Sequence, residues 1–436
     1  MFSSLEADLI SQWRGSLASM PRPTGTAAAV DRITELERLK CAAAAEQAQL
    51  SAELEEMTRR ERADAGVRKE KQAAGVASQI ALARHESPHK GARLLGFSKA
   101  LVHEMPHTFA ALQAGVLNEW RATILVRETA CLTREDRQTV DREISGDLRQ
   151  LRTRGDRELE AAAKRLAYRL DAESVVRRAR RAETERTVTI RPAPDTMTYV
   201  TALLPVAQGV GVYAALKRAA DSARSDGDER SRGQVMADTL VERVTGAPAD
   251  QPVTVDISLV MTDRSLLGGD DEPALLPGFG LVPAALARDL VAAAIDEGHA
   301  WLRRLYTSPA TGDLVAMDSR ARHFPTGLGR FIHVRDGGRC RTPWCDAPIR
   351  QLDHAVRHTD GGTTSGPNGQ GLCEACNLAK EAAGWRARPR PGPRHTVETT
   401  TPTGHRYRSL APPLPGAPHP GLSKLELYVT DLILAV

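Results

Sequence analysis

The sequence contains few aromatic residues and no long apolar run. Phe, Trp and Tyr make up only 4% of the chain, so its core must rely on small aliphatic side chains rather than on large rings. No stretch approaches the about 20 apolar residues that a membrane-spanning helix needs. Residues Met1–Gly15 lack the basic head and apolar run of a signal peptide. We therefore expect a soluble protein with no membrane partner.

Cysteine is also scarce. Six cysteines in 436 residues are too few for a disulfide scaffold. Cys41 and Cys131 stand alone in helical segments, where we expect them to act as small core residues. The other four gather near the C-terminal end, in a pattern typical of a metal site. Because thiolate metal sites suit a reducing compartment, we expect a cytoplasmic location.

Long stretches rich in Ala, Leu, Arg and Glu predict a mainly helical fold with a small α+β region. At 436 residues, the chain is long enough for two or three domains. The predicted divisions are a flexible lead (1–26), a body (27–318) that is helical to about 185 and α+β from about 186, a C-terminal module (319–385) and a Pro- and Arg-rich extended tail (386–436).

The strongest helical pattern runs over residues 27–62. Ile33, Leu36 and Leu39 follow i, i+3 spacing among Ala, Glu and Gln. Such a helix packs either within the chain or against a second copy, so a homodimer through the N-terminal helices is one alternative. Asn118 and Thr133 have the chemistry of helix caps. Further helices are expected near 72–85, 97–103, 107–114, 116–129, 133–150 and 155–181.

After residue 186 the periodicity changes. Alternating residues on either side of the turn Ala193–Thr196 predict a β-hairpin over 187–192 and 197–204. The rest of this region is expected to hold helices near 206–224, 231–245 and 283–297, and strands near 253–262, 301–306 and 313–317.

The string His103-Glu104-Met105-Pro106-His107 matches the H-E-x-x-H pattern of zinc proteases, which requires one continuous helix. Pro106 disfavours helical geometry at Met105 and lacks a backbone donor. We therefore expect one helix to end here and another to open at Pro106, which argues against protease chemistry.

Four cysteines in two pairs mark the C-terminal module. The pairs are Cys340-x4-Cys345 and Cys373-x2-Cys376, a spacing that can close a tetrahedral zinc site. Cys373 and Cys376 alone would also suit a redox dithiol, but the second pair favours structural zinc. Zinc binding would supply folding free energy that so small a segment cannot obtain from core burial.

Polar residues with catalytic chemistry lie between and just after these pairs. Asp353 and His354 end a predicted short strand, and a glycine-rich loop carrying Asn368 follows. The next helix, from about Glu374, carries Asn377 and Lys380 about one turn apart. This order can bring Asp353, His354 and Asn377 around one divalent cation.

These residues resemble the signature of the HNH nucleases. Thirteen residues separate His354 from Asn368, and eight separate Asn368 from Asn377. Asn377 stands where the third histidine of that signature usually lies, which is the HNN variant. The resemblance implies a ββα-metal, treble-clef-like module stabilised by zinc.

The resemblance also implies a role for each residue. His354 would be the general base that activates water, Asp353 and Asn377 would hold Mg²⁺ or Mn²⁺, and Asn368 would brace the loop and orient His354. Lys380 would contact phosphate, although a solvated helix lysine is an equal alternative. A histidine with the ordinary pKa of about 6.5 suits a base at neutral pH.

The body resembles the 13E12-repeat family, whose members carry a DUF222 region followed by an HNH module. The stretches that carry this resemblance are Arg93–Ser98, Ala110–Gly115 and Arg191–Tyr199. The resemblance to this family covers most of the chain, but these stretches explain no chemistry.

Arginines cluster around the cysteine module, although the chain's formal net charge is only +4. A basic collar fits a polyanionic partner, and the residues expected to contact nucleic acid are Arg339, Arg341, Arg350 and Arg386. The sequence thus predicts a metal-dependent DNA endonuclease. The alternatives are a zinc-stabilised nucleic-acid-binding protein with an inactive module, and a regulatory protein that acts through its helices.

Overall fold

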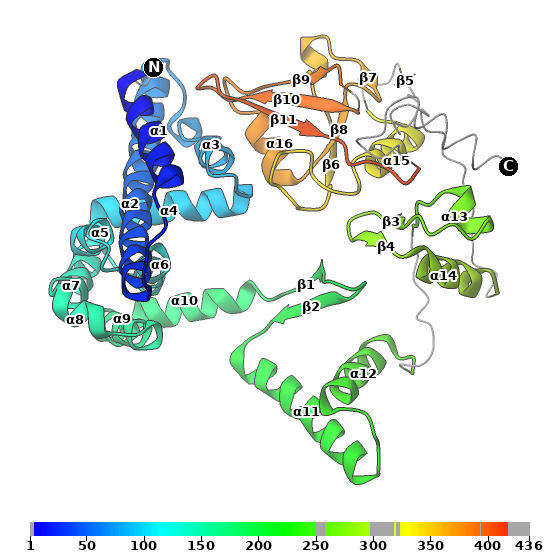
Figure 1. Ribbon diagram of the computed structural model, residues 1–436, viewed down its shortest axis with the longest axis horizontal. Coiled ribbons are helices and arrows are strands. Elements are labelled where there is room, and N and C mark those ends of the chain that lie inside the picture. The colour runs from blue at the N-terminus through cyan, green and yellow to red at the C-terminus, as the bar shows by residue number, and fades with distance from the viewer. Residues whose placement is uncertain (1–3, 249–257, 297–317, 320–322, 393, 417–436) are drawn as a thin grey trace. The chain divides into compact units, whose positions relative to one another are not determined.

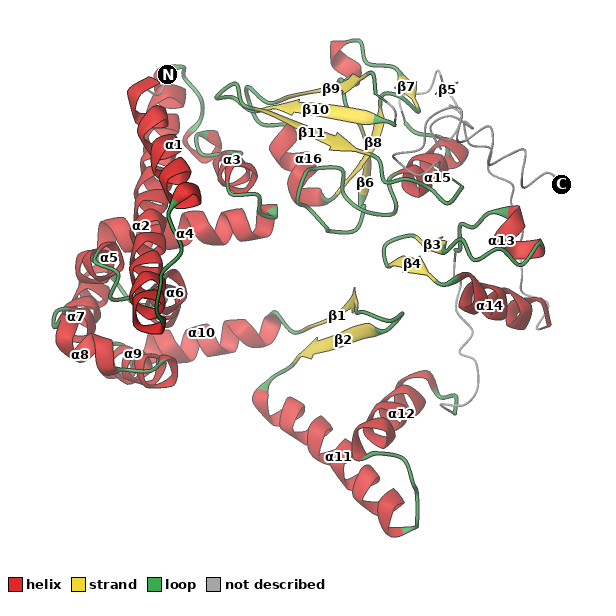
Figure 2. Ribbon diagram, in the orientation of Figure 1, coloured by secondary structure: helices red, strands yellow, loops and turns green. Residues whose placement is uncertain are grey.

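The computed structural model describes residues 4–248, 258–296, 318–319, 323–392 and 394–416 (Figure 1). These residues are mainly helical with several small sheets, as Figure 2 shows. The chain divides into two compact units. The first comprises Met1–Met57 and Leu95–Val176, and the second comprises Thr58–Leu94 and Arg177–Val436. Within the described part, no helix is both long and apolar enough to cross a bilayer.

The first unit is a helical assembly built on one long helix. The helices that lie in it wholly or in part are α1 (Ser4–Ser19), α2 (Thr26–Asp64), α4 (Pro88–Glu104), α5 (Pro106–Gln113), α6 (Glu119–Glu128), α7 (Arg134–Ser145), α8 (Leu148–Thr153), α9 (Asp156–Leu170) and α10 (Ala172–Thr184). Helix α1 occupies most of the segment that the sequence suggested to be a flexible lead. From Leu9 to its end, the side chains of α1 are exposed.

Helix α2 confirms the prediction of a long helix but buries a different face from the one expected. Ile33 and Leu39 remain largely exposed. The buried stripe consists of Cys41, Ala45 and Ala48, which pack in one core cluster with residues of α4, α5 and α6. Small side chains let helices approach closely, so these residues, rather than the larger apolar ones, form the contact.

Two predicted caps and one predicted helix break are confirmed. Asn118 accepts a hydrogen bond from the backbone N–H of Arg121, and Thr133 accepts one from that of Asp136. Helix α4 ends before Met105, and α5 opens with Pro106 at its first turn. The two histidines of the protease-like string therefore do not share one helix.

The middle of the chain contains the predicted hairpin. Strands β1 (Thr187–Pro192) and β2 (Thr198–Leu203) pair antiparallel. The other elements of the second unit that precede its C-terminal module are η1 (Lys69–Lys71), α3 (Val76–Ala83), α11 (Val206–Ser225), α12 (Arg232–Thr245), α13 (Asp263–Leu267), α14 (Ala284–Asp296) and the antiparallel pair β3 (Ala274–Leu276) and β4 (Gly280–Val282). The strands expected near 301–306 and 313–317, and the first half of that near 253–262, lie outside the described residues. The described half, 258–262, holds only an isolated bridge from Val260 to Leu275.

The C-terminal module surrounds a short antiparallel pair, β6 (Gln351–His354) and β8 (Gly369–Leu372), followed directly by helix α16 (Glu374–Lys380). The strand that ends at His354 and the helix that begins at Glu374 were both predicted. Helix α15 (Thr326–Arg335) precedes the first cysteine pair. The smaller elements are β5 (Asp318–Ser319), η2 (His358–Asp360) and β7 (Thr364–Ser365).

Within the described part of the segment expected to be an extended tail (386–436), strands within residues 386–410 form a sheet instead. Strands β9 (Arg386–Arg390), β10 (Thr396–Thr400) and β11 (Arg406–Leu410) make an antiparallel sheet with β10 in the centre. Proline is tolerated because Pro389 lies on an edge strand. The richness in Pro and Arg suggested an extended chain, but these residues alternate along the strands, so that every second side chain lies on the same face of the sheet.

Candidate metal centre

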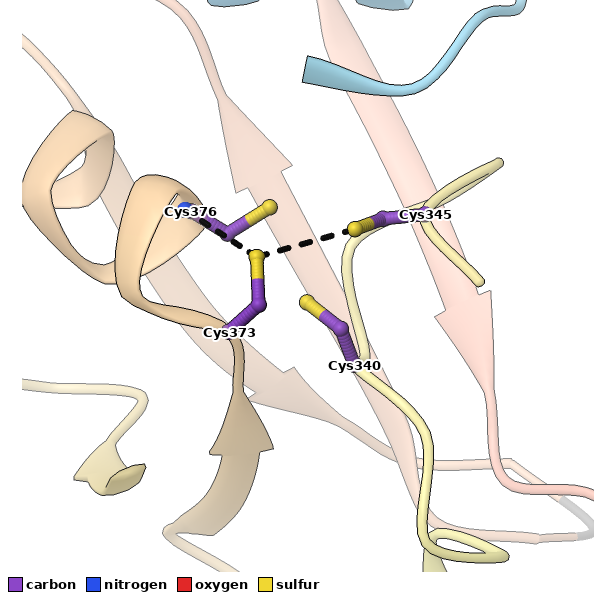
Figure 3. Close-up of side chains that lie close together, drawn as sticks. All are labelled: Cys340, Cys345, Cys373 and Cys376. Atoms are coloured by element: carbon purple, nitrogen blue, oxygen red, sulfur yellow. Dashed lines mark hydrogen bonds between the residues drawn. The ribbon is translucent and has the colours of Figure 1, made fainter. Parts of the chain in front are cut away.

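Four cysteines converge from a loop and from the start of a helix. Cys340 and Cys345 lie in the loop after α15, Cys373 is the N-cap residue of α16, and Cys376 lies in that helix's first turn. Their side chains point toward one another in Figure 3. All four are buried, and their sulfur atoms lie within 4.8 Å of one another.

This arrangement fits a tetrahedral metal ion. Zinc–sulfur bonds of about 2.3 Å place the sulfurs of a regular tetrahedron about 3.8 Å apart. The Sγ atoms of Cys345 and Cys373 are 3.7 Å apart. With Leu372, the cysteines form a small buried cluster, so a metal ion would sit where apolar side chains would otherwise hold the module together. The expected four-cysteine site is thus compatible with structural zinc.

The four thiols perturb one another's pKa values. The pKa of Cys373 lies below its ordinary value, chiefly because of its hydrogen bond with Cys340. The pKa of Cys376 is raised, again chiefly by its hydrogen bond with Cys340. A cation held at the centre would favour the thiolate form of all four groups.

Strand β6 separates the candidate catalytic residues, because neighbouring side chains on a strand face opposite sides. Asp353 faces α16, where its Oδ2 lies 2.6 Å from the Nζ of Lys380. Gln370 on β8 also donates to this carboxylate, over 3.3 Å.

One of the two expectations for Lys380 is wrong. It is only 6% exposed, so it is not a solvated helix lysine. Its ammonium group pairs with Asp353 and donates to the backbone carbonyl of His354 over 2.6 Å. The amine is thus engaged with β6.

His354 lies in a different environment from Asp353. Its Nε2 is 2.9 Å from the hydroxyl of Thr364 on β7. Its ring centroid lies 4.5 Å from that of Phe324 and 5.7 Å from that of His358. These contacts hold the imidazole in one orientation while leaving it half-buried.

Asn368 fixes the chain that follows His354. Its side-chain oxygen accepts a hydrogen bond from the N–H of Val356 over 2.9 Å, and its Nδ2 donates to the carbonyls of Val356 and Thr363. Gly362 is required beside it, because an added Cβ would lie 1.9 Å from the Val356 carbonyl oxygen. Asn368 therefore connects the glycine-rich loop to the end of β6.

Asn377 does not share a contact with Asp353. Its Nδ2 donates to Gln351, which lies two residues before Asp353 on the same face of β6. Its Oδ1 is buried and, within the described residues, accepts no hydrogen bond. The carboxylate of Asp353 and this unpaired oxygen are hard ligands of the kind that Mg²⁺ prefers. Both lie on the α16 side of β6, so the donor chemistry fits a hard cation, although Lys380 already neutralises the carboxylate.

The sequence missed several partners of this centre, namely Gln351, Thr364 and Gln370. The period of two along β6 could have indicated Gln351, since it shares a face with Asp353. Nothing in the local sequence indicates Thr364 or Gln370, because Gln370 reaches the centre through the pairing of β8 with β6, and Thr364 through the packing of β7 near His354.

Arg341 was expected to contact nucleic acid, and this prediction is wrong. Its side chain is only 4% exposed. It donates to the carbonyls of His395 and Ser409, over 3.1 and 2.8 Å, and lies near Asp336. Burial lowers the pKa of Arg341 to about 10, and the Asp336 carboxylate opposes that shift. Arg341 anchors the C-terminal sheet to the cysteine loop.

The other three arginines of the expected collar reach the surface. Arg339 is partly exposed, with its Nη1 3.6 Å from the Oδ1 of Asp346. Arg350 and Arg386 are exposed. Their positions are compatible with a polyanionic partner.

Replacing Arg341 with alanine should therefore destabilise the module. Asp336 keeps its ion pair with Arg335, so the main loss is the charged hydrogen bonds from Arg341 to the part-buried carbonyls of His395 and Ser409, at about 1.5–3 kcal/mol of unfolding free energy. Hydrogen exchange of β10 and β11 would measure this loss. The control, Arg339→Ala, removes an exposed pair and should change stability by less than about 1 kcal/mol. Equal protection in both variants would contradict the anchoring role.

The chain is thus a mainly helical protein that carries a small four-cysteine module with a strand pair and a helix. A family model described as "Domain of unknown function (DUF222)" matches residues 34–336, and the chain belongs to this family. The match ends just before Cys340, so it covers the body but not the cysteine module. No curated protein and no solved structure matches the chain.

Proposed function

We propose that this protein is a metal-dependent endonuclease that hydrolyses DNA phosphodiester bonds in its C-terminal HNH-like module. One observation supports the proposal: α16, whose first turn carries two of the four clustered cysteines, lies against the strand β6 that holds Asp353 and His354, through the pairs Lys380–Asp353 and Asn377–Gln351. A zinc-stabilised strand-and-helix unit of this kind would give a catalytic centre a rigid support.

His354 would act as the general base. Its contact with Thr364 orients the imidazole, and it would take a proton from the water that attacks phosphorus. Attack breaks the bond to the 3′ oxygen, which leaves with a proton from solvent. Asp353 and the unpaired oxygen of Asn377 would hold the Mg²⁺ or Mn²⁺ ion. When bound, that ion would offset negative charge in the transition state.

Lys380 has a defined part in this proposal. Its ammonium lies 2.6 Å from the Asp353 carboxylate and would have to yield part of that contact to a bound cation. Once displaced, it would remain near the site as a positive charge suited to a phosphate oxygen. The buried pair with Asp353 would then act as a resting arrangement.

The same ion pair supports a second candidate function, a zinc-stabilised nucleic-acid-binding protein with an inactive module. A carboxylate neutralised by lysine can be stable without any catalytic cation. The second candidate predicts DNA binding that needs no added divalent cation and leads to no cleavage.

Plasmid cleavage distinguishes the two functions. We expect the full chain with bound zinc to convert supercoiled DNA to nicked or linear forms when Mg²⁺ or Mn²⁺ is added, and to leave it intact without them. Gel analysis over time measures the rate, and a gel-shift assay measures binding in parallel. Binding without cleavage under all these cations would support the second candidate instead.

A further inference from the structure

The C-terminal sheet presents a basic face. Because alternate residues on a strand share a face, the register of β9, β10 and β11 places five arginines on one side. They are Arg386, Arg388, Arg390, Arg406 and Arg408. All five are exposed, and all lie on the two edge strands. Figure 1 shows β10 between β9 and β11.

The opposite face of this sheet is attached to the candidate catalytic centre. Ala387 on β9 and Val397 on β10 are buried in one cluster with Ala355, the residue that follows His354. Arg341 adds hydrogen bonds to His395 and Ser409 at the sheet's ends. The basic face is therefore held in a fixed position relative to β6.

A single acidic residue lies among these arginines. Glu398 on β10 receives hydrogen bonds from Arg390, over 2.7 Å, and from Arg408, over 3.0 Å. These two guanidinium groups lower the pKa of Glu398, with Arg390 contributing most. Glu398 thereby holds two of the five side chains across the sheet. Among the described residues, Arg386, Arg388 and Arg406 have no acidic partner within ion-pair distance.

We propose that this face binds the phosphate backbone of double-stranded DNA, an inference that rests on the proposed nuclease function. Alternate residues along a strand repeat every ~6.8 Å, and the two edge strands lie ~9.6 Å apart. The face thus offers a regular array of fixed positive charges, which suits a repeating polyanion. Guanidinium groups also bind phosphate oxygens in a bidentate way.

Other anionic partners fit this face less well. Leu410 is the only large apolar residue on it that is exposed, so the face has little to insert into a lipid bilayer. It also offers no cluster of apolar side chains of the kind that anchors a peptide or protein partner. Repeated charge without apolar anchors favours nucleic acid.

The test compares two sets of substitutions with the same change in charge. One variant carries Arg386→Gln, Arg388→Gln and Arg406→Gln on the basic face. The control carries Arg218→Gln, Arg224→Gln and Arg243→Gln at exposed positions of α11 and α12. Zinc content and circular dichroism establish that both variants fold like the parent chain.

Fluorescence anisotropy with a duplex DNA, at several salt concentrations and without added Mg²⁺ or Mn²⁺, measures binding alone. We expect the face variant to bind at least tenfold more weakly near 0.1 M salt. Its slope of log K against log salt should be smaller by about 2.7, because each lost phosphate contact removes about 0.9. The control should bind like the parent chain.

Two outcomes would overturn the proposal. Equal weakening in both variants would show that overall charge, not this face, governs binding. The proposal would also be excluded if the face variant bound DNA as tightly as the parent chain. That holds whether or not the variant loses binding to anionic vesicles or to an acidic peptide. The cleavage assay is separate. If DNA binding depends on the basic face but no cleavage occurs, the nuclease function is refuted while the proposal that this face binds DNA is retained.

Discussion

Replacing Cys373 with serine is expected to release zinc and unfold the C-terminal module. Cys373 has two roles, because its sulfur is one of the four in the cysteine cluster and also accepts the N-cap hydrogen bond from the backbone N–H of Cys376 in α16. Structural zinc contributes about 10–16 kcal/mol of apparent binding free energy in small zinc-finger peptides. The remaining apolar cores of the module are small, so they would not offset a loss of this size.

The measurement is zinc content by mass spectrometry, together with limited proteolysis. We expect about one zinc per chain to fall to nearly none, and cleavage sites to appear in β6, β8 and the C-terminal sheet. Cys131→Ser is the matched control, because Cys131 is a free cysteine outside the cluster. A Cys373→Ser protein with unchanged zinc and unchanged protease resistance would refute the metal centre.

Replacing His354 with alanine is expected to abolish most DNA cleavage while zinc and fold are retained. General base catalysis contributes about 10²–10⁴-fold to a rate, and the cleavage rate should fall by that factor. The imidazole contacts Thr364, Phe324 and His358 but lies outside the cysteine cluster, so its loss should leave the metal site intact.

Single-turnover cleavage at saturating DNA isolates the chemical step from binding. His405→Ala is the matched control, because His405 is exposed and its ring contacts only Thr403 among the hydrogen bonds of the described residues. The control should cleave at the parent rate. Equal cleavage by the His354→Ala and parent proteins would remove His354 from the mechanism, whatever the module's activity.

Local patterns predicted much of the secondary structure. The caps at Asn118 and Thr133, the break before Pro106 and the β1–β2 hairpin depend on residues close together in sequence. Backbone sterics and cap hydrogen bonds act over a few residues, so the sequence shows them directly. The four-cysteine cluster was predictable for a related reason, since metal geometry constrains ligand spacing.

The contacts of the catalytic candidates could not be predicted in this way. Lys380 and Asp353 lie far apart in sequence, and their ion pair exists because α16 lies against β6. The same packing pairs Asn377 with Gln351. The basic tail was misjudged because composition suggested an extended chain, whereas strand pairing and the burial of Ala387 and Val397 produce a sheet.

The sequence by itself determined the helical body, the position of the cysteine cluster and the identity of the polar residues beside it. Only the tertiary structure decided which face of α2 is buried, that Arg341 is an internal anchor, and that the exposed arginines of the last three strands share one face. The reason is physical. Propensity and ligand spacing act locally, whereas burial and charge pairing depend on which segments meet after folding.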